Sequence, residues 1–192
     1  PQKVIVTGAS SFIGCHLAIK LSNDDYNVIA TGSKRSDLYE GIQKDRIKSL
    51  TNNDVQFETL DILNKENIKK FIHKYLPDIW FHLPAWTSDW GSYNFDLVKA
   101  FQLNVLPLEF IYEYLSESGC VGFIQVGSEA EYGGKKGCKS EKDPCYPSMP
   151  YGFTKLTQTI RSNQLAYQYN LRTRVGRVFT PFGTLENPNK II

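Results

Sequence analysis

The stretch 7-TGASSFIG-14 follows directly on a short β-rich run, 3-KVIVT-7, and opens a segment, 12–21, whose apolar residues recur at helical spacing. The two glycines have separate uses here: Gly8 permits a tight turn, and Gly14 permits the helix to pack closely on the strand. The helix start then offers unpaired N–H groups and positive dipole to a pyrophosphate. The stretch therefore predicts a strand-turn-helix unit that binds a dinucleotide.

Ser11 stands where this pattern usually has its middle glycine. A β-carbon there crowds the approach of a phosphate, although serine is small and its hydroxyl can donate a hydrogen bond. A plain turn that binds nothing is the alternative. The candidate cofactor contacts of this turn are Gly8, Ser10, Ser11, Phe12, Ile13 and Gly14.

The same alternation of strand and helix patterns continues along the chain. Apolar β-rich runs predict strands over 27–31, 55–60, 79–83, 121–126 and 173–179. Helical spacing predicts helices over 64–75, 96–118 and 151–170, with a bend at Pro107 in the second. Repeated βαβ units with right-handed crossovers imply an α/β fold built on a doubly wound parallel sheet.

Composition excludes several classes of protein. The chain has 192 residues, 41% of them hydrophobic, and a net charge of +2, which is too small to indicate nucleic acid or an acidic membrane as a partner. No apolar run approaches a membrane span, and the chain starts in a strand without a signal peptide, so we expect a cytoplasmic protein. The cysteines lack C-x-x-C spacing and the three histidines form no ligand set, so we expect reduced thiols and no metal.

The segment 151-YGFTK-155 carries the strongest catalytic pattern. Tyr151 and Lys155 lie one turn apart on the same face of the predicted helix. A nearby ammonium favours phenolate over phenol, so Lys155 is expected to lower the pKa of Tyr151 and to make it an acid/base near neutral pH. Ser128, at the end of the fifth strand, is placed to share a substrate oxygen with the phenol; a simple turn serine is the alternative.

The second strand ends in 32-GSKR-35, without the carboxylate that NAD sites usually place there. Ser33, Lys34 and Arg35 would suit a 2′-phosphate, so NADP(H) is favoured over NAD(H); a solvated basic turn is the alternative. After the third strand, Asp61 is a candidate for the adenine amino group, with Ile62 packing on the ring. A helix N-cap is the other use of Asp61.

At the end of the fourth strand, small residues in 81-FHLPA-85 would let the backbone pass close to the cofactor ribose, with Leu83 and Ala85 as the candidate contacts. His82 is expected to be structural. Asn104 is expected to hold a backbone kink or a water near the site, with a buried structural amide equally open. The Gly/Pro-rich stretch 133–150 is either a loop beside the active site or a solvated excursion.

Together these segments resemble the extended short-chain dehydrogenase/reductase superfamily, in its nucleotide-sugar epimerase/dehydratase branch with a Rossmann fold. The resemblance covers nearly the whole chain, in order: TGASSFIG (7–14), LDIL (60–63), HLPA (82–85), Asn104, GSEAEYG (127–133), PYGFTK (150–155) and RVFTPFG (177–183). It implies that Tyr151 is the acid/base and that Ser128 hydrogen-bonds the sugar oxygen. Lys155 would lower the tyrosine pKa and, with Tyr151, contact the nicotinamide ribose.

Departures from the family pattern narrow the function. Ala130 stands where sugar 4,6-dehydratases carry a glutamate base, which disfavours a dehydratase. Thr180 replaces an asparagine near the substrate, and Glu129 and Ser128 are the other substrate candidates. The segment 127–133 most resembles 4-keto-sugar reductases. We therefore expect an NADP(H)-dependent oxidoreductase acting on a nucleotide-activated 4-keto sugar. The alternatives are an NAD(P)-dependent nucleotide-sugar 4-epimerase and a non-catalytic dinucleotide-binding module.

The resemblance also bears on domains and assembly. Residues 1–180 correspond to the NAD(P)-binding domain and residues 181–192 to the start of the substrate-binding region, so the C-terminal substrate domain is expected to be largely absent from this chain. Relatives often dimerise through the long helix and the Tyr-Lys helix. Phe101, Val105, Leu108 and Tyr112 would permit a homodimer here, although core packing explains their apolar character equally well.

Overall fold

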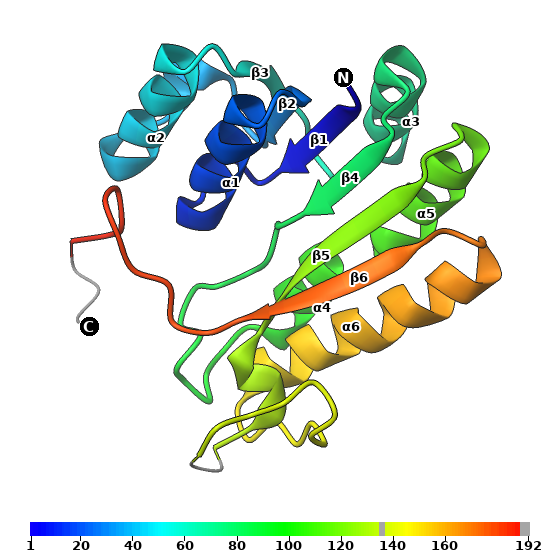
Figure 1. The fold of residues 1–192 in the computed structure, drawn as a ribbon. Coiled ribbons are helices and arrows are strands. Elements are labelled where there is room, and N and C mark those ends of the chain that lie inside the picture. Colours follow the sequence, from blue (N-terminus) through cyan, green and yellow to red (C-terminus); the bar gives the residue numbers. More distant parts are fainter. Residues whose placement is uncertain (135–136, 189–192) are drawn as a thin grey trace.

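The computed structural model describes residues 1–134 and 137–188. Within them, six strands form a single parallel sheet in the order β3-β2-β1-β4-β5-β6 (Figure 1). The strands are β1 (Lys3–Thr7), β2 (Asn27–Gly32), β3 (Gln56–Thr59), β4 (Ile79–His82), β5 (Gly122–Ser128) and β6 (Thr173–Val178). The chain runs outward from β1 to β3, returns to the middle at β4 and runs outward again to β6. The predicted doubly wound sheet is confirmed.

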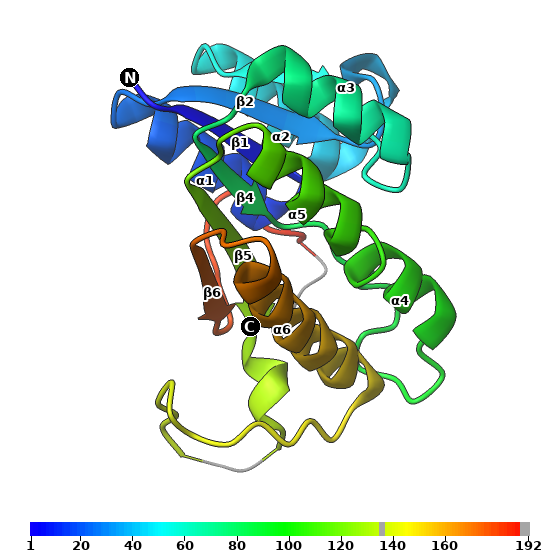
Figure 2. The ribbon, with the colours of Figure 1, turned by 90° about the vertical axis from the view of Figure 1, so that its right-hand side faces the viewer.

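Helices cover both faces of this sheet (Figures 1 and 2). One face is covered by α1 (Phe12–Asn23) and α2 (Gly41–Asn52). The other is covered by α3 (Lys65–Tyr75), α5 (Leu108–Glu117) and α6 (Pro150–Gln168), with α4 (Leu97–Asn104) packed beside α6. Short 3-10 turns, η1 (Ser36–Leu38) and η2 (Glu129–Tyr132), follow β2 and β5. Among the described residues, no helix has the length and apolar character to cross a membrane.

The central strand β1 shows why the core has two halves. Val4 and Val6 point to the face under α1 and α2, whereas Ile5 points to the opposite face, where α3 and α5 pack. All three side chains are fully buried. A parallel strand covered on both faces reads as a continuous apolar run, which is why 3-KVIVT-7 predicted β1 with the observed bounds.

The sequence predicts a single helix over 96–118 with a bend at Pro107. The structure has two separate helices there instead of one bent helix. Helix α4 ends at Asn104, and α5 begins at Leu108 with Pro107 as its N-cap residue. Proline has no N–H for the helical ladder, and its ring clashes with the preceding turn. The break leaves residues 105–107 between α4 and α5.

Helix α2 was not predicted from the sequence. Its buried residues are Arg46, Ile47 and Leu50, and most of its other residues are polar and exposed. So few apolar positions give a weak periodic signal in the sequence. The buried face is completed by the aliphatic part of the Arg46 side chain.

Two residues expected at a dimer interface belong to the core instead. Leu108 and Tyr112 are fully buried, and the Tyr112 ring packs on Phe123 of β5 with centroids 4.4 Å apart. Phe101 and Val105 are only partly buried. The apolar character of Leu108 and Tyr112 is therefore explained by packing of α5 on the sheet.

His82 ends β4 inside this core, with an exposed fraction of 1%. Its ring stacks on Phe123 at a centroid distance of 5.6 Å. Neither ring nitrogen has a hydrogen-bond partner within the described residues. Burial, and secondly the positive charge of Lys155, lower the pKa of His82 to about 3. The imidazole is thus a neutral packing element, as expected for a structural side chain.

Replacing His82 by phenylalanine should reduce the sensitivity of the fold to acid. The unfolded chain binds a proton at His82 near pH 6.5, whereas the folded chain does so only near pH 3. Stability should therefore fall by about 1.4 kcal/mol for each pH unit as the pH drops through this window. Urea unfolding at a series of pH values should show a shallower slope for His82→Phe. The exposed His73→Gln serves as control and should keep the wild-type slope; an unchanged slope in His82→Phe would contradict the assignment.

Candidate active site

The turn between β1 and α1 requires its two glycines. Gly8 has a φ of +72°, and a β-carbon there would lie 3.2 Å from Pro84 N. A β-carbon on Gly14 would lie 2.5 Å from the Gly8 carbonyl oxygen. Ser11 is the N-cap of α1, and its hydroxyl oxygen accepts from Gly14 N at 3.1 Å. Serine in place of the middle glycine thus caps the helix, and its O–H can still donate outward.

A cleft of about 470 Å³ opens at the carboxyl ends of the strands, beside this turn. Half of the predicted cofactor contacts line it: Gly8, Ser10, Ser11, Ser33, Asp61, Ile62, Leu83 and Ala85. Among the other lining residues, Gln43, Thr87 and Leu103 were not singled out from the sequence. Phe12, Ile13 and Gly14 lie in α1 and do not line the cleft.

In the basic turn after β2, the Arg35 side chain and the Lys34 backbone N–H are hydrogen-bonded to neighbouring residues. The Arg35 guanidinium donates to both carboxylate oxygens of Asp37, at 3.1 and 2.9 Å. The Lys34 backbone N–H donates to the Tyr39 hydroxyl at 3.2 Å. A β-carbon on Gly32 would lie 2.3 Å from that same hydroxyl oxygen. Position 32 therefore has no room for a side chain while Tyr39 holds this place, and the charge of Arg35 is offset by Asp37.

The side chains of Asp61 and Asn104 each accept a hydrogen bond from a backbone N–H group. The Asp61 carboxylate accepts from Leu63 N at 3.0 Å, whereas the N-cap of α3 is Asn64. The alternative use of Asp61 as the helix N-cap is therefore wrong. The buried Asn104 amide accepts from Trp86 N at 2.8 Å and donates to the Thr154 hydroxyl at 3.4 Å. Asn104 thus ties the segment after β4 to α4 and α6, as a structural amide does.

The structure brings Ser128 and Tyr151 together. Ser128 ends β5, and Tyr151 lies in the first turn of α6. The phenol ring packs against Trp90 and Phe95, with centroids 6.2 and 6.0 Å away. Burial raises the pKa of Tyr151; a hydrogen bond with the Ser128 hydroxyl lowers it, and the charge of Glu131 raises it. The net effect is a raised pKa.

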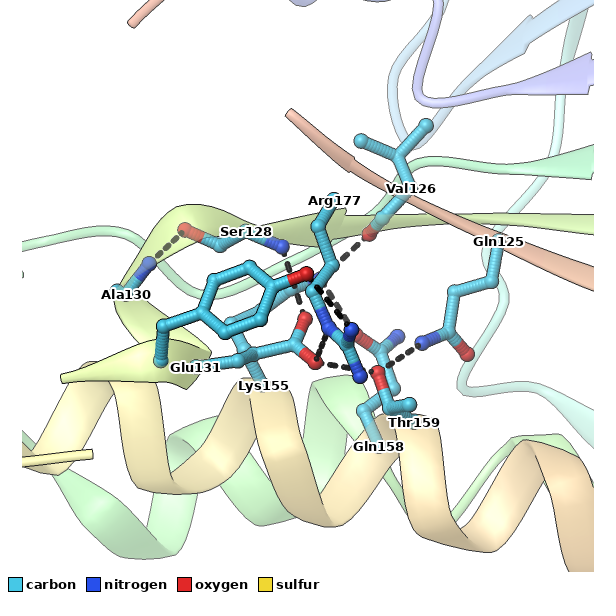
Figure 3. Close-up of polar contacts among 10 residues, drawn as sticks. Gln125, Val126, Ser128, Ala130, Glu131, Lys155, Gln158, Thr159 and Arg177 are labelled. Atoms are coloured by element: carbon cyan, nitrogen blue, oxygen red, sulfur yellow. Dashed lines mark hydrogen bonds and ion pairs between the residues drawn. The ribbon is translucent and has the colours of Figure 1, made fainter. Parts of the chain in front are cut away.

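Lys155 lies one turn after Tyr151 with an exposed fraction of only 2%. Its ammonium donates to the Val126 carbonyl oxygen at 2.8 Å and to the Gln158 side-chain oxygen (Figure 3). Burial lowers the pKa of Lys155 to about 8, against an opposing effect of the Glu131 charge. The expected lowering of the Tyr151 pKa by Lys155 is therefore not what the structure gives, because burial of the phenol outweighs other effects and the ammonium points to other acceptors.

A buried ion pair that the sequence analysis did not single out lies behind Ser128. The Glu131 carboxylate is fully buried and pairs with Arg177 of β6 (Figure 3). Breaking such a pair by removing one partner usually costs about 3–5 kcal/mol, because a buried charge is left alone. The Ser-x-x-Glu spacing of Ser128 and Glu131 forms a capping box, and this signal could have singled out Glu131 but not its arginine partner.

The two other predicted substrate residues meet at the surface nearby. The Thr180 hydroxyl donates to the Glu129 carboxylate at 3.3 Å, and both residues are exposed. Within the described residues, no three His, Cys, Asp or Glu side chains gather as a metal-ligand group. Ser128, Tyr151 and Lys155 do not line the cleft. Their hydroxyl, phenol and ammonium groups form a separate cluster between β5 and α6, which suits proton transfer.

Comparison with known proteins identifies relatives over nearly the whole chain. The model of the NAD dependent epimerase/dehydratase family matches residues 4–192. A UDP-glucose 4-epimerase of Pisum sativum is 27% identical over 97% of this chain and 54% of its own length. Protein CapI of Staphylococcus aureus is 24% identical over 98% of this chain and 57% of its own length. The chain therefore spans little more than half the length of these relatives.

A solved structure gives the same result. UDP-glucuronic acid 4-epimerase from Bacillus cereus, in complex with UDP-glucuronic acid and NAD, has a TM-score of 0.82 and 28% identity. The match covers 98% of this chain and 60% of that protein. The resemblance to the extended short-chain dehydrogenase/reductase superfamily is thus confirmed, and the chain belongs to the NAD dependent epimerase/dehydratase family.

Proposed function

We propose that this chain is the dinucleotide-binding and catalytic part of a nucleotide-sugar 4-epimerase. The observation that carries the proposal is the hydrogen bond between the Ser128 hydroxyl and the Tyr151 phenol, in a chain whose separate cleft is lined by the turn of Gly8. The UDP-sugar 4-epimerases among its relatives support the epimerase over the reductase. In this proposal residues 1–180 hold the cofactor and the catalytic groups, and residues 181–192 begin the substrate-binding region.

The residues present fit a dinucleotide. Gly8 and Gly14 leave no room for β-carbons, and Ser11, the N-cap residue of α1, lines the cleft. A bound nicotinamide supplies the reversible acceptance of a hydride from a sugar carbon. The chain itself moves the proton: Tyr151 takes it from the sugar hydroxyl during oxidation and returns it to the carbonyl oxygen during reduction. Ser128 holds that oxygen by a hydrogen bond, while the Lys155 ammonium is held by the Val126 carbonyl oxygen and the Gln158 side chain.

Tyr151→Phe should abolish most turnover and leave the fold and the cofactor affinity nearly intact. Loss of a general acid/base should lower kcat by about 10²–10⁴-fold, because the ring still packs but no proton can move. The measurement is interconversion of UDP-glucose and UDP-galactose, and of the corresponding uronates, with added NAD. Tyr167→Phe is the matched control, since Tyr167 lies on the same helix with 93% of its surface exposed. Full activity in Tyr151→Phe would refute the proposal.

A 4-keto-sugar reductase is the second candidate, because 127-GSEAEYG-133 resembles that group. The cofactor separates the two: an epimerase returns the hydride to the same sugar and consumes no cofactor, whereas a reductase oxidises one cofactor molecule per turnover. Net oxidation of NADH or NADPH in the presence of a 4-keto sugar nucleotide would favour the reductase.

For the cofactor we propose NAD(H). The expected preference for NADP(H) finds no support, since Arg35 is engaged by Asp37 and the related B. cereus structure contains NAD. A fluorescence titration should show NADH binding about tenfold more tightly than NADPH, because a 2′-phosphate meets no unpaired guanidinium. Asp37→Asn should release Arg35 and narrow this gap; Asp45→Asn, another exposed aspartate, should leave it unchanged. Tighter binding of NADPH than of NADH by the wild-type chain would contradict the proposal and support NADP(H) as the cofactor.

We also propose that the chain forms a homodimer through the outer face of α4 and α6. These helices lie side by side (Figure 2) and expose Leu97, Val98, Phe153 and Ile160. Sedimentation velocity should give a dimer, and the double variant Val98→Asp, Ile160→Asp should be monomeric, because two charges would be buried in the interface. Val121→Asp, an exposed apolar position outside this face, should remain dimeric. A wild-type monomer at high concentration would contradict the proposal.

A further inference from the structure

The carboxylate of Glu131 joins the segment that carries Ser128 to two other elements of the site. Its Oε1 accepts from Ser128 N at 2.8 Å. Its Oε2 accepts from the Thr159 hydroxyl and from Arg177 Nε, each at 2.9 Å (Figure 3). Thr159 lies on α6, the helix of Tyr151, and Arg177 lies on β6. One side chain therefore ties the end of β5 to α6 and β6 directly behind the Ser128 hydroxyl.

The surrounding backbone leaves this carboxylate little freedom. A β-carbon on Gly127 would lie 2.6 Å from Glu131 Oε1, so the strand passes directly over the carboxylate. A β-carbon on Gly152 would lie 2.3 Å from the Ala130 carbonyl oxygen, so α6 presses equally closely on η2. Glu131 cannot shift without moving the backbone of Ser128 or the first turn of α6.

We propose that Glu131 is a positioning residue, which fixes the Ser128 hydroxyl against the Tyr151 phenol and makes the surroundings of that phenol more negative. The inference rests on the proposed proton transfer by Tyr151 and adds to it a residue that touches neither sugar nor cofactor. Arg177 and Thr159 act through Glu131, because they hold the carboxylate that holds Ser128.

The charges around the phenol agree with this role. Burial raises the pKa of Tyr151, and Glu131 is the charged group that raises it further. Glu131 also opposes the lowering of the Lys155 pKa by burial. Among the described residues, other charged or titratable groups act on the phenol only through these two residues. Arg177 pairs with Glu131 and interacts electrostatically with Cys145. The charge of Lys155 acts on His82 of β4. Removing the charge of Glu131 should therefore favour the phenolate.

The first test is Glu131→Gln, which keeps the shape and removes the charge. The pKa of Tyr151 is obtained from the phenolate absorbance of each protein minus that of its Tyr151→Phe counterpart. In Glu131→Gln this pKa should fall, because the phenolate is no longer repelled. In the assay of interconversion, kcat should fall by about tenfold or more, since Ser128 is less well placed, while NADH affinity is unchanged. An unchanged Tyr151 pKa in a folded Glu131→Gln protein would overturn the proposal.

The second test, Thr159→Val, removes one donor and leaves the charge in place, and it carries the proposal if Glu131→Gln does not fold. Amide hydrogen exchange at Ser128 should become faster, because its acceptor is less firmly held, while the pKa of Tyr151 stays raised. Unchanged exchange at Ser128 would overturn the proposal.

The matched control is Glu109→Gln. Glu109 also pairs with an arginine, Arg161, and accepts from a tyrosine, Tyr169, but on the outer side of α5 and α6. It should change neither the pKa of Tyr151 nor the exchange at Ser128. Titration and exchange use the chain without cofactor or sugar, so they can succeed even where turnover is absent. A wild-type chain that fails to bind NADH would refute the proposed function by a separate observation.

Discussion

The reversal of strand order between β1 and β4 determines where everything else can lie. The crossover after β1 runs to one side of the sheet and the crossover after β4 to the other, so the loops that follow these two strands diverge. The divergence leaves the cleft that Gly8 and Ser11 line from one side and Leu83 and Ala85 from the other. Close contact remains at its floor, where a β-carbon on Gly8 would meet the backbone of Pro84. The glycine is therefore a consequence of the topology as much as of any ligand.

The half of the sheet beyond β4 has a polar interior. Lys155, Gln158, Thr159, Ser162, Gln125 and Glu131 are all buried between α6 and the end of β5. Most of their polar atoms are paired: Gln125 donates to Thr159, Ser162 donates to Gln125, and Lys155 donates to the Val126 carbonyl oxygen. Buried polar groups weaken a core unless every member is satisfied. A fold that keeps a buried ammonium and a buried carboxylate beneath its proposed catalytic groups has given up stability at that place, as functional sites commonly do.

Close packing between η2 and α6 connects this interior to the surface of the site. Gly152 lies between Tyr151 and Lys155 in the sequence, and only its missing side chain lets α6 approach the Ala130 carbonyl oxygen. The glycine in 151-YGFTK-155 thus has a packing role that is separate from the chemistry of its neighbours. Burial of the Tyr151 phenol, against which Trp90 and Phe95 pack, is the main cause of its raised pKa.

The sequence by itself determined the features whose causes are local. The bounds of β1, the glycine turn and the start of α1 follow from neighbouring residues, as does the placing of Tyr151 and Lys155 on one helical turn. Most of the strands followed from short apolar runs, and the family followed from motifs in order. The sequence was a poor guide to α2, whose stripe is narrow, and to the break at Pro107.

Only the tertiary structure decided how distant segments act on one another. Ser128 contacts Tyr151 because β5 and α6 pack together. The pKa of the phenol is raised because the side chains of Trp90 and Phe95 help to bury it. The pairing of Glu131 with Arg177 joins residues that are far apart in the chain, and so no local pattern contains it. Burial and charge depend on all neighbours in space, whereas a sequence pattern reports only neighbours along the chain.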